Sequence, residues 1–196
     1  MDPNFVLDFW LGGRGPVPPS RERIGRWFAV DPEFDASIRS GFDAAVGRAL
    51  GGEFGEWETD PQSRVALVLL LDQFPRNLYR DDPRSFAGDP RGLELTRRTS
   101  ETELDALHPL ERYFALVPWM HAEDLQAQVA GEAAFSTSVD AVPAEFRSLF
   151  ENGLGYATRH RRVIERFGRF PHRNAVLDRE ATPEERAFVE EFGTGF

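Results

Sequence analysis

The stretch VALVLLLDQFPRN, residues Val65 to Asn77, decides the fold class. Its first seven residues are apolar without interruption, and such a run is typical of a helix that is packed on every side. A polar pair, Asp72 and Gln73, follows the run. Proline lacks the backbone N–H and clashes with the preceding turn, so Pro75 predicts that the helix breaks here, with polar side chains beside the break.

The rest of the chain carries helix signals of one kind. At six places Asp or Thr is followed by Pro, and an Asp or Thr N-cap with Pro at the first helical position is a favoured helix start. Between these starts, apolar residues such as Phe34, Ile38, Phe42 and Val46 recur every four positions, which marks one face of a helix. The six pairs are Asp2-Pro3, Asp31-Pro32, Asp60-Pro61, Asp82-Pro83, Asp89-Pro90 and Thr182-Pro183.

These patterns predict an all-α fold of roughly eight to ten helices, packed around a central apolar helix that contains Val65 to Leu71. No alternating stretch of useful length and no hairpin dipeptide indicates strands. Ser136 to Val142 has the composition of a surface connection between two helices. None of the predicted connections is long enough to separate two domains, so we predict a single domain over residues 1–196.

Composition excludes several classes of function. The net charge of −10 argues against binding to nucleic acid, because that requires cations that neutralise phosphates. All 23 basic residues are Arg and Cys is absent, so lysine Schiff bases, thiol nucleophiles and cysteine metal sites are excluded. The first residues lack a signal-peptide pattern, and no apolar run approaches the ~20 residues that span a bilayer. We therefore expect a cytoplasmic protein without a membrane partner.

A second phrase, Phe170-Pro171-His172-Arg173-Asn174, begins 96 positions after Phe74 and repeats its aromatic residue, proline, arginine and asparagine. Each copy places polar side chains at a proline after an apolar stretch. His160 precedes the second copy and falls on the apolar face of the helix predicted between Pro143 and Gly168. A buried imidazole requires a hydrogen-bond partner, so His160 is either a satisfied core residue or the acid, base or ligand at the floor of a pocket.

Arginines surround the second phrase. Residues 159–173 carry six Arg and one Glu, a local charge near +5 in a chain of net charge −10. Such a group could bind a carboxylate or phosphate, or it could pair with the acidic excess of the chain. The candidate catalytic residues are His160, His172 and Asp72, and the candidate ligand-binding residues are Arg76, Asn77, His121, Asp124, Arg169, Arg173 and Asn174.

Two of these candidates have specific alternatives. His121 and Asp124 are three residues apart and could form a histidine–carboxylate pair, whereas an acid at this position also suits the start of a helix. Asp72 could pair with Arg76 four residues later, or reach Arg173 or a histidine. A metal site of His121, Glu123, His160 and His172 is a further alternative, although no metal-ligand spacing is present and no cofactor is indicated.

The phrases together resemble a bacterial family of uncharacterised proteins, domain-of-unknown-function family 924, over about Val6 to Phe192. The resemblance implies an all-helical fold with packing similar to tetratricopeptide superhelices, and it implies no reaction. The phrases that carry it are Phe9-Trp10, Asp72-Gln73-Phe74-Pro75-Arg76-Asn77, His121-Ala122-Glu123-Asp124 and Arg166-Phe167-Gly168-Arg169-Phe170-Pro171-His172-Arg173-Asn174.

Three hypotheses of function follow. In the first, a polar pocket binds a small anionic ligand, and His160 acts as acid or base if there is turnover. In the second, a tetratricopeptide-like groove binds a peptide or a protein partner without catalysis. In the third, the two phrases lock helix ends together and have no ligand. The second hypothesis predicts exposed aromatic residues, for which the candidates are Trp10, Trp27, Trp57 and Trp119.

Overall fold

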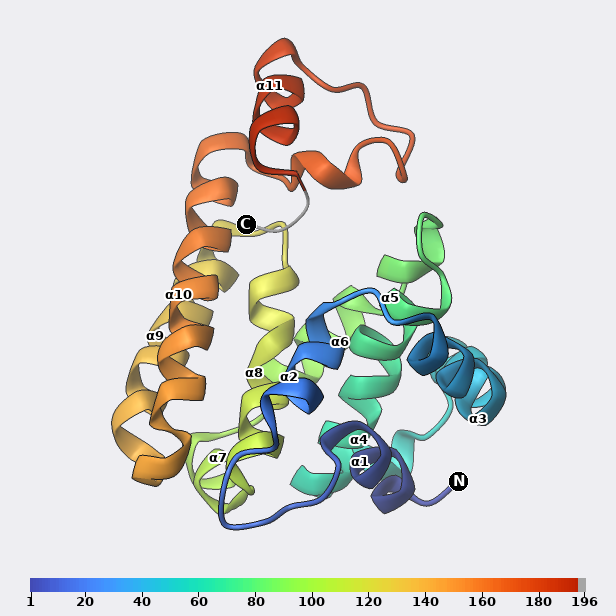
Figure 1. Ribbon diagram of the computed structural model, residues 1–196, viewed down its shortest axis with the longest axis vertical. Coiled ribbons are helices and arrows are strands. Elements are labelled where there is room, and N and C mark those ends of the chain that lie inside the picture. The colour runs from blue at the N-terminus through green and yellow to red at the C-terminus, as the bar shows by residue number, and fades with distance from the viewer. Residues whose placement is uncertain (194–196) are drawn as a thin grey trace.

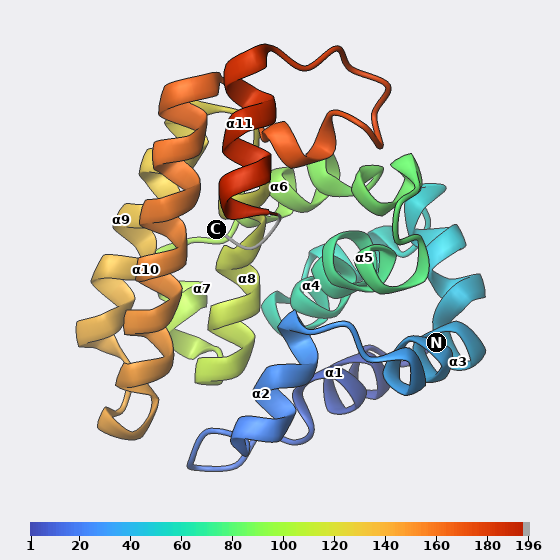
Figure 2. The ribbon, with the colours of Figure 1, turned by 45° about the horizontal axis from the view of Figure 1, so that its top comes forward.

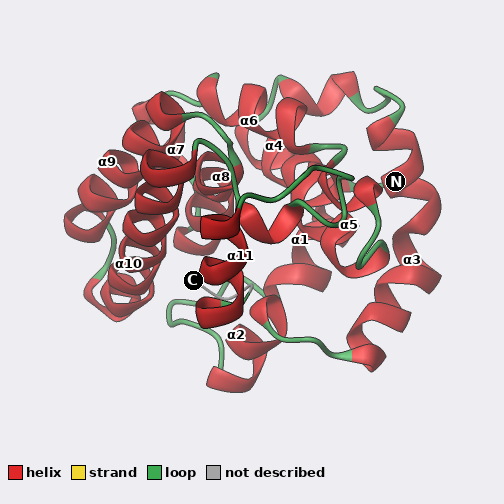
Figure 3. Ribbon diagram, turned by 90° about the horizontal axis from the view of Figure 1, so that it is seen from above, coloured by secondary structure: helices red, strands yellow, loops and turns green. Residues whose placement is uncertain are grey.

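The structure, a computed structural model, describes residues 1–193. Within this range every regular element is a helix and none is a strand, which confirms the all-α prediction (Figure 3). The α-helices are α1 (Pro3–Leu11), α2 (Arg21–Phe28), α3 (Pro32–Leu50), α4 (Pro61–Val68), α5 (Phe74–Leu78), α6 (Asp89–Arg97), α7 (Glu101–Ala106), α8 (Pro109–His121), α9 (Leu125–Ala141), α10 (Ala144–Phe167) and α11 (Pro183–Phe192). Shorter turns are η1 (Gly55–Glu58), η2 (Leu69–Gln73), η3 (Pro83–Phe86) and η4 (Pro171–Arg173).

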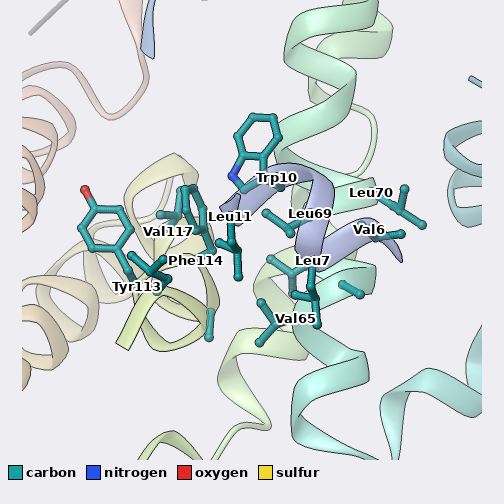
Figure 4. Close-up of a cluster of buried hydrophobic side chains, with 14 of the residues drawn as sticks. Val6, Leu7, Trp10, Leu11, Val65, Leu69, Leu70, Tyr113, Phe114 and Val117 are labelled. Carbon is teal, nitrogen blue, oxygen red and sulfur yellow. The ribbon is translucent and has the colours of Figure 1, made fainter. Parts of the chain in front are cut away.

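The apolar run lies at the centre of the core, as predicted. Every residue from Val65 to Leu71 is buried, and α4 packs against α1, α6 and α8. Figure 4 shows side chains of α1 between those of α4 and η2 on one side and those of α8 on the other. The labelled members of this cluster are Val6, Leu7, Trp10, Leu11, Val65, Leu69, Leu70, Tyr113, Phe114 and Val117.

Helix α8 lies between two groups of helices (Figure 1). Helices α4 and α6 pack on one side of it, and the hairpin of α9 and α10 packs on the other. Gly153 permits the close approach of α10, because a Cβ there would lie 2.7 Å from the Phe135 ring and 2.8 Å from the Tyr113 ring. The approach brings the side chains of α10 that follow Gly153 close to the last turns of α8.

Five of the six Asp-Pro or Thr-Pro pairs begin a helix as predicted, because the Asp or Thr side chain accepts a backbone N–H of the first turn. The prediction is wrong for Asp89. Gly88 is the N-cap of α6, and Asp89 is the first residue of that helix. The Asp89 carboxylate is therefore available for contacts with other elements.

Pro75 does not end a helix, contrary to the prediction. The chain passes from α4 through η2 into α5 in a helical conformation, because η2 is a π-helical turn in which the Phe74 N–H reaches the carbonyl of Leu69, five residues earlier. The wider turn accommodates the proline ring, which in a regular helix clashes with the carbonyl four residues before it. Pro118 likewise lies inside α8, which continues to His121.

The prediction of a surface connection at residues 136–142 is also wrong, because α9 continues to Ala141. Ser138 lies within this helix, where its hydroxyl donates to the carbonyl of Ala134 at 2.8 Å and accepts from Arg112 at 2.9 Å. These tertiary contacts satisfy a polar side chain that favours turns in isolation. Within the described residues, no helix is long and apolar enough to cross a membrane.

Candidate functional site

The π-helical turn and Gly88 together position the first polar side chains. A Cβ on residue 88 would lie 2.1 Å from the carbonyl oxygen of Leu71, far inside contact distance. Only glycine therefore allows the chain to pass so close to η2. Helix α6 begins immediately after Gly88 and packs against η2, so Asp89 faces the segment that carries Asp72 and Arg76.

Asp89 connects the two proline phrases. Nη2 of Arg76 lies 2.9 Å from Asp89 Oδ1, and Nη1 of Arg173 donates to Asp89 Oδ2 at 3.1 Å. Arg173 also donates from Nη2 to the carbonyl of His121 at 3.1 Å, at the carboxyl end of α8. The equivalent arginines of the two phrases thus bind one carboxylate, although 97 residues separate them in the sequence.

The Arg173 guanidinium lies in an aromatic environment. Its central carbon is 4.5 Å from the ring centroid of Phe86 and 4.6 Å from that of Phe170. Burial lowers the pKa of Arg173 to about 10 and the Asp89 charge opposes this shift, so the side chain is cationic at neutral pH. A buried guanidinium between aromatic faces and a carboxylate is held in one orientation.

His121 and Asp72 form a histidine–carboxylate pair. Nδ1 of His121 lies 2.6 Å from Oδ1 of Asp72, and the Asp72 side chain is fully buried. Gln73 donates from Nε2 to the other carboxylate oxygen, and Nη1 of Arg76 lies 3.3 Å from Oδ1. The carboxylate that meets His121 is therefore Asp72 from the central segment, whereas Asp124 accepts the N–H of Ala127 and caps α9.

The contacts of Asp72 determine the tautomer of His121. Burial alone raises the pKa of Asp72, but the Arg76 charge and the contacts with His121 and Gln73 hold it well below its usual range. The carboxylate is thus ionised and can only accept hydrogen bonds, so Nδ1 of His121 must donate. Burial and the Arg76 charge lower the pKa of His121, so the ring is neutral at pH 7 and its Nε2 carries a lone pair.

A pocket of about 260 Å³ is lined by His121, His160 and Arg76 together with aromatic side chains. The rings of His121 and His160 are 6.4 Å apart, and Nδ1 of His160 donates to the carbonyl of Tyr156 at 2.9 Å. The polar side chains form one end of the pocket, and aromatic and aliphatic side chains form its walls. The complete lining is Trp27, Phe28, Gln73, Arg76, Tyr113, Val117, Met120, His121, Tyr156 and His160.

Burial changes the protonation of His160 and His172. Burial lowers the pKa of His160 to about 4, and the neighbouring His121 and the charges of Arg173 and Arg159 lower it further, against the hydrogen bond to the carbonyl of Tyr156. Burial lowers the pKa of His172 to about 3, and the Arg173 charge adds to this shift. A cationic imidazole is thus disfavoured at both positions, chiefly because burial removes the charged ring from water.

The remaining candidate residues lie around the pocket rather than in it. Asn77 donates to the carbonyl of Gln73 and accepts from Arg80. Arg169 forms two hydrogen bonds with Glu185 of α11, at 2.6 and 2.8 Å, and Asn174 and His172 line a separate pocket against α11. Arg173 and Asp124 line a third pocket, on the other side of His121 from the aromatic walls.

Sequence reasoning missed Asp89 and the aromatic side chains of Phe28, Tyr113 and Tyr156. The role of Asp89 could not be recognised, because the pair Asp89-Pro90 has the pattern of a helix N-cap followed by the first helical residue. The aromatic residues come from three different helices and share no sequence pattern. The interaction hypothesis predicted exposed tryptophans. This prediction is wrong for Trp10, Trp27 and Trp57, which are buried, whereas Trp119 is half-buried.

The described residues contain no group of three or more His, Asp or Glu side chains that could hold a metal ion. Glu123, one member of the alternative metal site, instead accepts the N–H of Phe170 at 2.7 Å and two hydrogen bonds from Arg179. These contacts hold the loop after α10 against the start of α9, which explains this carboxylate without a metal.

Comparisons with known proteins place the chain in a family. The profile of a family described as "Bacterial protein of unknown function (DUF924)" matches residues 6–193, so the chain belongs to this family. The solved "Structure of Protein of Unknown Function ATU0120 from Agrobacterium tumefaciens" is 35% identical, with a TM-score of 0.76 over 96% of this chain and 97% of that chain. A search of curated proteins gives no match. The resemblance seen in the sequence is thereby confirmed.

Proposed function

We propose that this chain binds a small anionic ligand in the pocket lined by Arg76, His121 and His160, and that His121 acts there as a general base. The observation that carries the proposal is the 2.6 Å contact between Nδ1 of His121 and Oδ1 of Asp72 at the wall of this pocket. A carboxylate in this position orients an imidazole, fixes its tautomer and stabilises the proton that it takes up.

The residues that line the pocket limit the reaction class. Among the described residues, the lining includes no Ser, Thr or Cys, so a covalent mechanism with such a nucleophile is not supported. A lone pair on Nε2 of His121 supports abstraction of a proton from water or from the ligand itself. Burial raises the pKa of the Tyr113 hydroxyl, so this group stays protonated and could donate a hydrogen bond to the ligand.

The local charges favour an anion over a cation. The guanidinium groups of Arg76 and Arg173 and the carboxylates of Asp72 and Asp89 balance one another, and the half-buried imidazoles are neutral. Among the described residues that line the pocket, however, the one formal charge is the guanidinium of Arg76. An anion in the pocket would therefore gain electrostatic energy, and beside His160 it would favour uptake of a proton by the ring.

The competing hypothesis is the protein-interaction module. Burial of Trp10, Trp27 and Trp57 removes three of the four aromatic side chains that this hypothesis expected to be exposed. The convergence of both phrases on Asp89 also fits the purely structural hypothesis, because a shared carboxylate ties helix ends together. A ligand test separates these alternatives from the proposed function.

The test is a thermal-shift and calorimetric titration with acetate, propionate, phosphate and sulfate at constant ionic strength. A ligand at ~100 times its Kd stabilises the native state by about 2.7 kcal/mol, or roughly 5–10 °C for a domain of this size. We expect a saturable shift with at least one anion, weakened in His160→Gln and unchanged in Arg162→Gln, which removes an exposed charge of α10 outside the pocket. Absence of a saturable shift with every anion refutes the proposal.

A further inference from the structure

The pocket beside His121 adjoins a second, larger one. The second pocket has a volume of about 530 Å³, and it shares Phe28, Tyr113 and Tyr156 with the first. These three aromatic residues therefore lie between the two adjoining pockets. We call the two pockets together the cleft, which has His121, His160 and Arg76 at its polar end, the three aromatic residues in its middle, and Arg21 and Asn152 at its other end.

The cleft runs along one face of each of three helices. Asn152, Tyr156 and His160 are spaced four apart on α10, so they point in the same direction. At a rise of ~1.5 Å per residue, the eight residues from Asn152 to His160 correspond to about 12 Å along the helix. Helix α8 lines both pockets through Tyr113. Helix α2, which Figures 1 and 2 draw beside α8, lines both pockets through Phe28.

The aromatic middle of the cleft is exposed to solvent. Phe28 is 55% exposed and Tyr156 is 38% exposed, although both side chains line the two pockets. Their rings lie nearly parallel, with an interplanar angle of 18° and centroids 6.1 Å apart. The ring of Tyr113 forms the buried wall beside them. A planar group bound here would cover apolar surface of both rings, in the offset-stacked or edge-to-face contacts that aromatic pairs prefer.

We infer that the ligand of this site is an aromatic anion, whose ring lies against Phe28 and Tyr156 and whose charged group lies beside Arg76 and His160. The inference rests on the proposed function, because it takes the polar end of the cleft as the site of the charge. It adds a second determinant, an aryl group one short linker away from the acid. Tyr156 and His160 are four residues apart on α10, ~6 Å along the helix, which a linker of three bonds together with the half-width of the ring spans.

Helix α2 supplies the specificity for the ring. Its buried anchor is Trp27, whose Nε1 donates to the carbonyl of Trp10 at 2.9 Å and whose ring meets Phe114 edge-on. The next residue, Phe28, is thus held at the cleft while its own side chain remains exposed. A fixed backbone with an exposed aromatic side chain is a preorganised binding surface, since little further ordering is needed when a ligand arrives.

The experiment compares aromatic and aliphatic anions with the same charged group. The probes are 3-phenylpropionate against propionate, and 2-phenylethylphosphonate against ethylphosphonate, titrated calorimetrically into the full chain. We expect the aromatic member of at least one pair to bind about tenfold more tightly or better. Such a gain corresponds to about 1.4 kcal/mol, within the range for a buried aromatic contact together with the apolar area that it covers.

The variants test whether the gain comes from the proposed residues. Phe28→Ala and Tyr156→Ala change exposed side chains and should abolish most of the tenfold preference, measured in each variant as the ratio of its affinities for the aromatic and the aliphatic anion. Phe5→Ala is the matched control, because Phe5 is also 55% exposed but lies on α1, away from the cleft. In this control the aromatic preference should be unchanged.

The outcomes separate this inference from the proposed function. Equal binding of aromatic and aliphatic anions, with the affinity reduced in His160→Gln, overturns the aromatic inference and leaves the anion site intact. An aromatic preference that survives in both Phe28→Ala and Tyr156→Ala also overturns it. Equally tight binding of neutral 3-phenylpropanol overturns the aromatic-anion assignment and refutes the proposed function as well. If none of the probes binds, both the aromatic inference and the proposed function are refuted.

Discussion

Arg173 donates to Asp89 at 3.1 Å, and this carboxylate also lies 2.9 Å from Arg76. Removing the charge from Asp89 leaves two guanidinium groups without a shared anion, and Arg173 is buried. We predict that Asp89→Asn destabilises the protein by about 3–5 kcal/mol, the cost of breaking a buried ion pair at one partner. Urea unfolding followed by circular dichroism measures this change.

Asp140→Asn is the control for the preceding prediction. Asp140 is exposed and lies 3.8 Å from Arg147, also an exposed side chain. A surface ion pair of this kind contributes about 0–1 kcal/mol, so the urea midpoint should change little. If Asp89→Asn and Asp140→Asn have equal effects on the free energy of unfolding, Asp89 does not connect the two phrases energetically.

Gly88→Ala tests the close contact with the π-helical turn. The added Cβ would lie 2.1 Å from the Leu71 carbonyl oxygen, and backbone atoms cannot move aside as a flexible side chain can. We predict destabilisation by about 2 kcal/mol or more, comparable with other cases of overpacking in a core. The melting temperature should fall by several degrees.

Gly41→Ala provides the opposite expectation for the same substitution. Gly41 lies in the middle of α3, and nothing lies within 4 Å of a Cβ built there. Alanine has the higher helix propensity, so this variant should be stabilised by about 0.5–1 kcal/mol. Similar melting temperatures for the two variants would contradict a steric role of Gly88.

The half-buried histidines make the stability depend on pH. In the folded protein the pKa values of His160 and His172 are about 4 and about 3, whereas an unfolded chain has a value of about 6.5. Between these values the unfolded state binds more protons, so the free energy of unfolding is largest above about pH 6.5 and decreases as the pH falls toward 4. Urea titrations at pH 7.5, 6 and 5 should show a progressive decrease.

The variant His160→Gln removes one of these titrating groups. Its decrease in the free energy of unfolding between pH 7.5 and 5 should therefore be smaller than that of the wild type. An unchanged decrease would mean that His160 titrates in the folded state as it does in the unfolded chain. His172→Gln provides an independent measurement of the same kind.

The tautomer of His121 can be observed directly. Because Asp72 accepts from Nδ1, nitrogen NMR should show a protonated Nδ1 and an unprotonated Nε2 at pH 7. The Asp72 charge raises the pKa of His121 against the larger effects of burial and Arg76, so Asp72→Asn should lower this pKa further. A protonated Nε2 in the wild type would falsify the assignment of His121 as a base at that atom.

Much of the fold could be predicted because its determinants are local. An uninterrupted apolar run can be buried only in the centre of a small protein, and the Asp-Pro pairs cap helices through contacts within one turn. The prediction failed where a tertiary contact replaced a local one. The hydroxyl of Ser138 bonds within α9 and to Arg112, and Asp89 binds two arginines in place of its own helix end.

The candidate site was harder to predict because its contacts are distant in the sequence. Polar residues beside the two prolines could be recognised, since polar groups at the end of an apolar helix require partners. The partner of His121 could not be identified, because Asp72 is 49 residues away and Asp124 is three. The aromatic side chains of the pocket meet because α2, α8 and α10 pack in one particular register. The periodicity of apolar residues on one helix does not determine how that helix is aligned with another.

The π-helical turn makes the geometry of the central segment as important as its composition. The π-helical turn holds about one residue more than a regular turn, and each residue of an α-helix advances about 100° around the axis. If the same residues formed a regular α-helix, the apolar run would remain apolar, yet α5 would rotate by about that angle relative to α4 and Arg76 would turn away from Asp89. Changes that make this turn regular at unchanged length should therefore be less tolerated than exchanges among its aliphatic residues.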